Sequence, residues 1–367
     1  MAFVEPFGEV RGAGACSLYT LRDGDGHSLS VTDFGAGIVR LVVPAAGGPL
    51  DVALGYDGAA AYDGGARADR PYLGCVVGRV ANRIRGGAFA LDGEAFTVPA
   101  NDGANALHGS TRGFDRRRWA RVGEDSASSI TFEYKSPAGE MGFPGELTAR
   151  CTYTLEGGGR LRTQLEATCD APTPVALAQH CYWNLAGHAS GQTVDAHVLE
   201  VNSNAYTDTN HKLIPTGELV DVSGTPLDFR LGVAVGSRVD EAGGYDHNFV
   251  LARTRCRAGE EVRARGGGGH TAVDSRLPRV ARLLAALLTP TPFRQVRRCA
   301  RLSCVESGVA FELCTNAPGV QVYSGNFLDG EKGKGGAVYP TRGGIALETR
   351  TCAATMHAAA PHRRPAS

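Results

Sequence analysis

The chain has 367 residues, with 38 Lys and Arg against 38 Asp and Glu, so its formal net charge is zero. That balance indicates neither a nucleic acid nor a membrane surface as a partner. Hydrophobic residues make up 43% of the chain, which is ample for a large buried core, while 50 Gly and 18 Pro interrupt it too often for long helices. The composition favours many short strands joined by turns.

Neither the first residues of the chain nor its cysteines indicate export. The first ten residues lack the basic and apolar regions of a secretory signal. No run of about 18 apolar residues predicts a membrane-spanning helix. The ten cysteines are scattered without a Cys-x-x-Cys pair, so we expect reduced thiols in a reducing compartment and therefore a cytoplasmic protein.

Alternation of apolar and polar residues predicts strands along most of the chain. The clearest strand signals lie at 39–43, 51–55, 130–134 and 161–167. Turns at 91–94 and 156–159, both rich in glycine, separate neighbouring signals. This spacing predicts a large antiparallel β protein, an all-β sandwich with no obvious linker before residue 252.

Two segments depart from this pattern. Residues 253–298 are rich in Arg, contain four consecutive glycines at 266–269, and hold a helix-like apolar run at 280–288. A strand pattern resumes at Ala300. The tail, residues 352–367, shows no strand pattern.

Six polar motifs are spread over the chain between these strands. Each motif places two or three Asn, Arg, His, Asp, Gln or Glu among apolar residues that would hold them in place. They are Gly-Arg-Val-Ala-Asn-Arg-Ile at 78–84, Asn-Ala-Leu-His-Gly at 105–109, Gln-His-Cys-Tyr-Trp-Asn-Leu at 179–185, Tyr-Asp-His-Asn-Phe-Val-Leu at 245–251, Pro-Gly-Val-Gln-Val-Tyr-Ser-Gly-Asn at 318–326 and Gly-Ile-Ala-Leu-Glu-Thr-Arg at 344–350. Together they suit a neutral, polyhydroxylated ligand on which protons are moved.

The motifs and their order resemble the galactose mutarotase (aldose 1-epimerase) family, from about residue 15 to 350. The resemblance implies one galactose mutarotase-like supersandwich, a single domain over residues 1–367 with an open sugar cleft on one face. It implies interconversion of the α and β anomers of free hexoses such as galactose and glucose, by acid and base ring opening and reclosure. It also implies a small aldohexose as the partner, with no metal and no cofactor.

Two residues are the candidates for proton transfer. The resemblance makes Glu348 the base and His180 the acid. Without it, an exposed strand glutamate and a core histidine are the simpler interpretations. His188 lies eight residues after His180, a spacing that does not favour a zinc pair.

Five residues match the positions at which the family binds its sugar: Asn82, Arg83, His108, Asp246 and Gln321. Arg83 offers a planar fork of donors, and the Asp246 carboxylate can accept from two neighbouring hydroxyls. Turn capping is the alternative for Asn82 and Asp246. For Trp183 and Phe114, core packing is more typical than sugar contact. Ser110 stands where the family has a second glycine after the histidine.

The resemblance is interrupted at 253–298 and ends after Thr351. We interpret 253–298 as a basic, Gly- and Arg-rich disordered insertion, with an acidic partner as the alternative. Residues 352–367 are an atypical tail in place of the family's closing strand. Two further functions stay open: a catalytically impaired sugar-binding or regulatory protein, and a hexose-6-phosphate 1-epimerase, which needs a cationic pocket. We expect a monomer or weak dimer.

Overall fold

The computed structural model describes residues 2–65, 70–124, 126–251, 282–288 and 296–350, with the backbone alone for 282–288. Strands dominate these residues, and the one α-helix among them is the five-residue α1 (Ala59–Asp63). The other helical turns in the same residues are η1 (Arg85–Gly87), η2 (Phe114–Arg116), η3 (Glu140–Gly142), η4 (Val194–Ala196), η5 (Val235–Ser237) and η6 (Lys334–Gly336). The predicted all-β class is confirmed.

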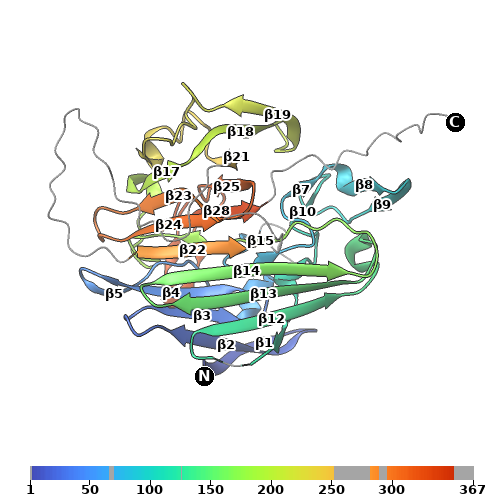
Figure 1. Ribbon diagram of the computed structural model, residues 1–367, viewed down its shortest axis with the longest axis horizontal. Helices are drawn as coiled ribbons and strands as arrows, with labels where there is room; N and C mark the ends of the chain where they lie inside the picture. The colour runs from blue at the N-terminus through green and yellow to red at the C-terminus, as the bar shows by residue number, and fades with distance from the viewer. Residues whose placement is uncertain (1, 66–69, 125, 252–281, 289–295, 351–367) are drawn as a thin grey trace.

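One layer of the fold is a nine-stranded sheet, drawn across the middle of Figure 1. In sheet order its strands are β11 (Ala120–Val122), β12 (Ser129–Ser136), β13 (Leu147–Glu156), β14 (Arg160–Cys169), β22 (Arg282–Leu288), β24 (Ala310–Thr315), β23 (Arg297–Ser303), β17 (Val198–Val201) and β20 (Val233–Ala234). The predicted strands at 130–134 and 161–167 lie in β12 and β14, and the glycine turn at 157–159 joins β13 to β14.

The second layer combines two antiparallel sheets. The first contains, in order, β1 (Phe3–Val10), β2 (Gly14–Arg22), β3 (Ser28–Thr32), β4 (Ile38–Ala45) and β5 (Gly48–Asp51). The other contains β16 (Tyr182–Trp183), β28 (Ile345–Arg350), β25 (Gly319–Tyr323), β21 (Asp246–Leu251), β18 (Ser203–Thr209) and β19 (Pro215–Asp221). They meet where Ala53 bridges Trp183 and the Leu54 amide donates to the Tyr182 carbonyl at 3.0 Å.

That junction corrects one prediction. The strand expected at 51–55 is wrong, because β5 ends at Asp51. The Val52 amide still donates to the Leu41 carbonyl of β4, and Ala53 then bridges Trp183 of β16. Four two-stranded ribbons complete the fold. They are β6 (Val76–Val77) with β15 (Ala178–Gln179), β7 (Arg83–Ile84) with β10 (Ala106–Leu107), β8 (Ala88–Leu91) with β9 (Glu94–Thr97), and β26 (Glu331–Lys332) with β27 (Val338–Tyr339). The predicted turn at 91–94 joins β8 to β9.

The main core lies between the two layers. Tyr19 of β2 packs edge-on against Phe132 of β12 at 5.5 Å between ring centroids, and Trp183 meets Phe311 of β24 in the same way at 5.7 Å. Each fully buried side chain of this size contributes roughly 1.5–3 kcal/mol to folding. Trp183 and Phe114 both belong to this core, as the sequence favours.

The segment 253–298 is described only in part. Its helix-like run at 280–288 is not a helix: Arg282–Leu288 forms β22, parallel to both β14 and β24. A short apolar run is compatible with a buried strand as well as with a helix, so the periodicity of the sequence could not distinguish the two structures. β23 begins at Arg297, three residues before the predicted restart. Residues 253–281, 289–295 and the tail 352–367 lie outside the described residues, so the insertion and tail stay predictions.

The predictions about membrane-spanning helices and about the cysteines can both be compared with the described residues. Among them, no helix is long and apolar enough to cross a membrane. The cysteines in the described ranges form no disulfide with one another. Most of them are buried, and burial raises the pKa of Cys16 to about 11 and that of Cys151 to about 12, so these thiols are protonated at neutral pH.

Candidate active site

The floor of the site is the outer face of β21, β25 and β28, three adjacent antiparallel strands. Asn248 pairs with Gln321, and Gln321 pairs with Glu348, so their side chains form one row across the sheet. Because successive residues of a strand face opposite sides, Val320 and Leu347 point into the core instead. The alternation in Gly-Val-Gln-Val and Ile-Ala-Leu-Glu therefore delivers polar groups to one face and apolar groups to the other.

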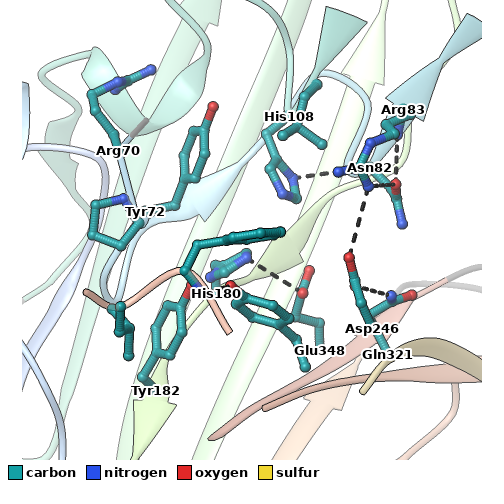
Figure 2. A pocket seen from close by; sticks show the side chains of 15 residues that line it. Arg70, Tyr72, Asn82, Arg83, His108, His180, Tyr182, Asp246, Gln321 and Glu348 are labelled. Atoms are coloured by element: carbon teal, nitrogen blue, oxygen red, sulfur yellow. Dashed lines mark hydrogen bonds and ion pairs between the residues drawn. The ribbon is translucent and has the colours of Figure 1, made fainter. Parts of the chain in front are cut away.

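A pocket of about 560 Å³, open at its mouth, lies above this floor. All seven predicted site residues line it, although they come from six different segments of the chain (Figure 2). The pocket is also lined by residues that were not predicted as site residues: Arg70, Pro71, Tyr72, Leu107, Tyr182, Tyr323, Phe327 and Leu328. Its lining is therefore mixed, with convergent polar groups among aromatic rings, as small-ligand sites commonly are.

His180 and Glu348 face each other inside the pocket. His180 Nε2 lies 3.4 Å from Glu348 Oε1, and the two side chains are 5% and 3% exposed. The His180 amide donates to the Cys75 carbonyl, and the Gly74 amide donates to the His180 carbonyl, both at 2.9 Å. Within the described residues, Glu348 Oε2 and His180 Nδ1 have no hydrogen-bond partner. An imidazole and a carboxylate are thus held rigidly with spare proton-transfer capacity.

Asn82 and His108 occupy turns with unusual backbones. Both have positive φ, 66° and 51°, which few non-glycine residues adopt and which is concentrated at functional sites. The Asn82 amide donates to His108 Nδ1 at 3.2 Å. A neutral His108 ring therefore carries its proton on Nε2. Burial, with His180 and Arg83 nearby, holds the pKa of His108 well below 6.5, so it is a neutral hydrogen-bond donor.

The two residues after His108 also have positive φ, and the first of them, Gly109, leaves no room for a side chain. Gly109 has a φ of 85°, and a Cβ there would lie 1.8 Å from the Gly78 carbonyl oxygen, so only glycine fits. Ser110, the departure from the family motif, also has positive φ (84°). Its buried hydroxyl donates to the Pro99 carbonyl at 2.6 Å, which offsets part of the conformational strain.

Arg83, Asp246 and Gln321 form one connected group. Gln321 Nε2 donates to Asp246 Oδ1 at 2.6 Å, and Arg83 Nη1 lies 3.9 Å from Asp246 Oδ2. Arg83 Nε donates to Asp102 Oδ2 at 2.7 Å, which fixes the plane of the guanidinium. These contacts leave Asp246 and the Arg83 fork side by side at one wall, arranged to bind adjacent hydroxyls.

The two arginines of the motif at 78–84 have different tasks. Arg79 is buried, and its guanidinium donates to the carbonyls of Ser136, Pro137, Pro144 and Gly145 at 2.8–3.0 Å. Those bonds clamp the loop that carries Asn82 and Arg83. Arg79 therefore supports the site from behind, while Arg83 reaches into it.

Motif analysis missed three residues beside the predicted ones. Asp102, which orients Arg83, follows Asn101 in an Asn-Asp-Gly turn, and that turn signal was available in the sequence. Arg70 and Tyr72 lie in a stretch with no polar motif. Only the fold brings them beside His108 and His180.

The described residues contain no group of three His, Cys, Asp or Glu that could hold a metal ion. His188 lies away from the pocket: its Nδ1 is 3.3 Å from the Tyr339 hydroxyl, and its Nε2 is 3.9 Å from Asp51. His180 and His188 therefore do not form a pair, as their spacing indicates.

Comparisons with known proteins agree on one family. A family model described as aldose 1-epimerase matches residues 17–363. That range runs through 253–298 and past Thr351, where the motifs alone predicted that the resemblance is interrupted and lost. The galactose mutarotase of Sus scrofa is 37% identical over 350 residues, which cover 94% of this chain and 88% of the relative. The aldose 1-epimerase of Escherichia coli K12 is 31% identical, covering 90% and 85%.

The fold gives the same result. The crystal structure of the GalM/aldose epimerase homologue from C. elegans superposes with a TM-score of 0.73 at 26% identity, covering 92% of this chain and 90% of that one. The expected galactose mutarotase-like sandwich is thereby confirmed. With the family model, the relatives and the fold in agreement, the chain belongs to the aldose 1-epimerase family.

Proposed function

We propose that the chain is an aldose 1-epimerase, an isomerase that interconverts the α and β anomers of free hexoses such as galactose and glucose. The observation that carries the proposal is the facing pair of His180 Nε2 and Glu348 Oε1, which lie 3.4 Å apart in the lining of the pocket. Such a pair supplies both proton transfers that ring opening requires.

In the proposed reaction, Glu348 takes the proton of the anomeric hydroxyl while His180 gives a proton to the ring oxygen. The C1–O5 bond breaks, and the open-chain aldehyde forms. Rotation about C1–C2 then presents the other face of the carbonyl. On reclosure the C5 hydroxyl oxygen attacks C1, His180 takes back the proton of that hydroxyl, and Glu348 returns its proton to the former carbonyl oxygen. Because the sheet and the backbone of 74–75 hold both side chains, little reorganisation is needed between the two steps.

The remaining predicted residues would bind the hydroxyls far from C1. Asp246 accepts and Arg83 donates at one wall, while neutral His108 donates through Nε2 at another. Gln321 Oε1, which has no hydrogen-bond partner among the described residues, is a further acceptor. Donors and acceptors in this mixture match hydroxyl groups, which both donate and accept.

Charge in the pocket argues against a phosphorylated hexose as the preferred substrate. The two arginines on its wall are both engaged with carboxylates: Arg83 with Asp102, and Arg70 with Asp115 at 2.6 Å. Asp246 and Glu348 add negative charge. A phosphate would meet these carboxylates with no uncommitted arginine on the described wall, which disfavours its binding.

Polarimetry of freshly dissolved α-D-galactose tests the proposal. The protein should accelerate the approach to anomeric equilibrium, and Glu348→Gln, a matched variant of nearly equal size, should abolish most of that acceleration. Galactose 6-phosphate in the same assay should equilibrate more slowly per enzyme. Equal rates with and without protein would reject epimerase activity and leave a sugar-binding protein, which calorimetry with galactose would detect. The monomer or weak dimer and the cytoplasmic location stay predictions.

A further inference from the structure

Tyr72 lies against both histidines of the site. Its ring centroid is 4.7 Å from that of His108 and 5.9 Å from that of His180, and the two imidazoles are 5.0 Å apart at 89° to each other. The rings therefore form a compact cluster on the pocket wall, which Figure 2 shows from one side.

Arg70 holds Tyr72 from the other side. The guanidinium carbon of Arg70 lies 5.0 Å from the centroid of the Tyr72 ring, a cation–π contact. Arg70 Nη1 donates to Asp115 Oδ2 at 2.6 Å, and the two side chains are 7% and 2% exposed. Asn101 Nδ2 donates to the Tyr72 hydroxyl at 3.3 Å. The ring is thus restrained at its face by Arg70 and at its hydroxyl by Asn101.

Stability alone is a poor reason for this arrangement. The φ of Tyr72 is 56°, a strained conformation for a bulky residue. A buried ion pair such as Arg70 with Asp115 is itself weak evidence for stability, since desolvation offsets much of its attraction. Strained residues and buried charges gather where structure serves function. Here the strained residue and the buried charge meet at one ring, next to the acid.

We propose that Tyr72, held by the Arg70–Asp115 ion pair, is a positioning residue that fixes the relative orientation of the His108 and His180 rings. This inference rests on the proposed epimerase function. His180 must aim at the ring oxygen while His108 donates to a hydroxyl of the same sugar, so both rings need fixed planes at once. A misplacement of about 1 Å in such a site costs on the order of 100-fold in rate.

The charge of Arg70 supports the same role. Burial does most to disfavour protonation of His108, and the charges of His180, Arg83, Arg350 and Arg70 add to it, with Arg70 the smallest of these contributions. Removing Arg70 therefore leaves the His108 ring less restrained and easier to protonate. A protonated His108 could no longer accept the Asn82 amide hydrogen bond through Nδ1. The loss of Arg70 should therefore change how the rate depends on pH.

Four variants test the proposal: Tyr72→Leu, Arg70→Met, Tyr72→Phe as the conservative replacement, and Tyr62→Leu as the control. Tyr62 is a buried tyrosine whose ring contacts, among the described residues, are with Phe7 and with Tyr56 (4.9 Å between centroids) and not with His108 or His180. We expect Tyr72→Leu to lower kcat for galactose roughly 10- to 100-fold with a smaller change in KM. Arg70→Met should act in the same direction and move the acid limb of the pH–rate profile upward. Tyr72→Phe should keep most of kcat.

Nitrogen-15 spectra of the histidine side chains provide a readout that does not depend on turnover. Tyr72→Leu and Arg70→Met should shift the ring-nitrogen signals of His108 and His180, whereas Tyr62→Leu should not. Unchanged kcat and unchanged histidine signals in either variant would overturn the proposal, as would an equal loss in Tyr62→Leu. If Tyr72→Leu does not fold, Arg70→Met decides. If the wild-type protein shows no mutarotation, the proposed function fails, yet the histidine spectra still decide the positioning role.

Discussion

The two faces of β21, β25 and β28 are equally buried yet chemically opposite. Leu347 is 4% exposed and Glu348 is 2% exposed, and in β25 the values are 0% for Val320 and 3% for Gln321. One face packs into the core between the layers, and the other forms the floor of the pocket. Burial therefore does not separate core from site in this protein. What separates them is the alternation along each strand and the partners that each side chain finds.

The two faces contribute to the stability of the folded protein with opposite signs. The apolar face stabilises the fold through the hydrophobic effect. On the polar face, Glu348 Oε2 and Gln321 Oε1 are buried without hydrogen-bond partners among the described residues, which costs free energy. A face that lowers stability while holding reactive groups in fixed positions is typical of a catalytic site.

The sharpest test of the comparison removes the reactive groups from the polar face. Glu348→Gln and His180→Asn should each lower the rate of galactose mutarotation roughly 10²- to 10⁴-fold, because each removes one positioned proton-transfer group. The thermal midpoint should stay the same or rise in Glu348→Gln, since a buried carboxylate is lost. Polarimetry and calorimetry measure the two quantities. A rate near that of the wild type in either variant would contradict the assigned role.

Leu347→Ala changes the adjacent residue, on the core face. It should lower the free energy of unfolding by about 2–5 kcal/mol, because a cavity opens between the layers. The rate per folded molecule should be nearly unchanged. Denaturant unfolding measures the stability, and Leu347→Met is the volume-conserving control. A large loss of rate with little loss of stability would show that the two faces are not independent.

Asp246→Asn tests the wall of the pocket. The change removes the charge that faces Arg83 and weakens acceptance from sugar hydroxyls, so KM for galactose should rise about 10-fold, close to 1.4 kcal/mol, with a smaller change in kcat. Steady-state kinetics separate the two constants. If kcat falls while KM stays constant, Asp246 belongs to the proton-transfer step and not to sugar binding.

A histidine away from the pocket shows that a buried neutral imidazole is not specific to the site. His197 Nε2 accepts from the Leu185 amide at 2.8 Å, and burial lowers the pKa of His197 from 6.5 to about 4. As the pH falls, His197 binds a proton in the unfolded chain before it does so in the folded protein. Its contribution to the free energy of unfolding is therefore fully present above pH 6.5 and declines as the pH falls toward 4.

We expect the titration of His197 to lower the free energy of unfolding by about 1 kcal/mol between pH 7 and pH 5.5. Thermal midpoints across that range should fall less in His197→Gln, which keeps an acceptor without titrating. Identical pH slopes in the two proteins would show that His197 does not carry the effect.

Local features could be predicted because they depend on neighbouring residues. Alternation located β12 and β14, and glycine turns located the β8–β9 and β13–β14 connections. The polar motifs identified seven residues that all line one pocket. The apolar run at 280–288 was misassigned because a helix and a buried strand satisfy the same short pattern.

The sequence by itself determined that the chain is a β protein whose polar motifs belong to an aldose 1-epimerase, since strand periodicity and family motifs are local properties. Only the tertiary structure decided which side chains meet. It set Glu348 opposite His180, gave Arg83 the partner Asp102, and placed Tyr72 between Arg70 and the two imidazoles. The physical reason is that such contacts depend on sheet register and on burial between segments far apart in the chain, which no local pattern encodes.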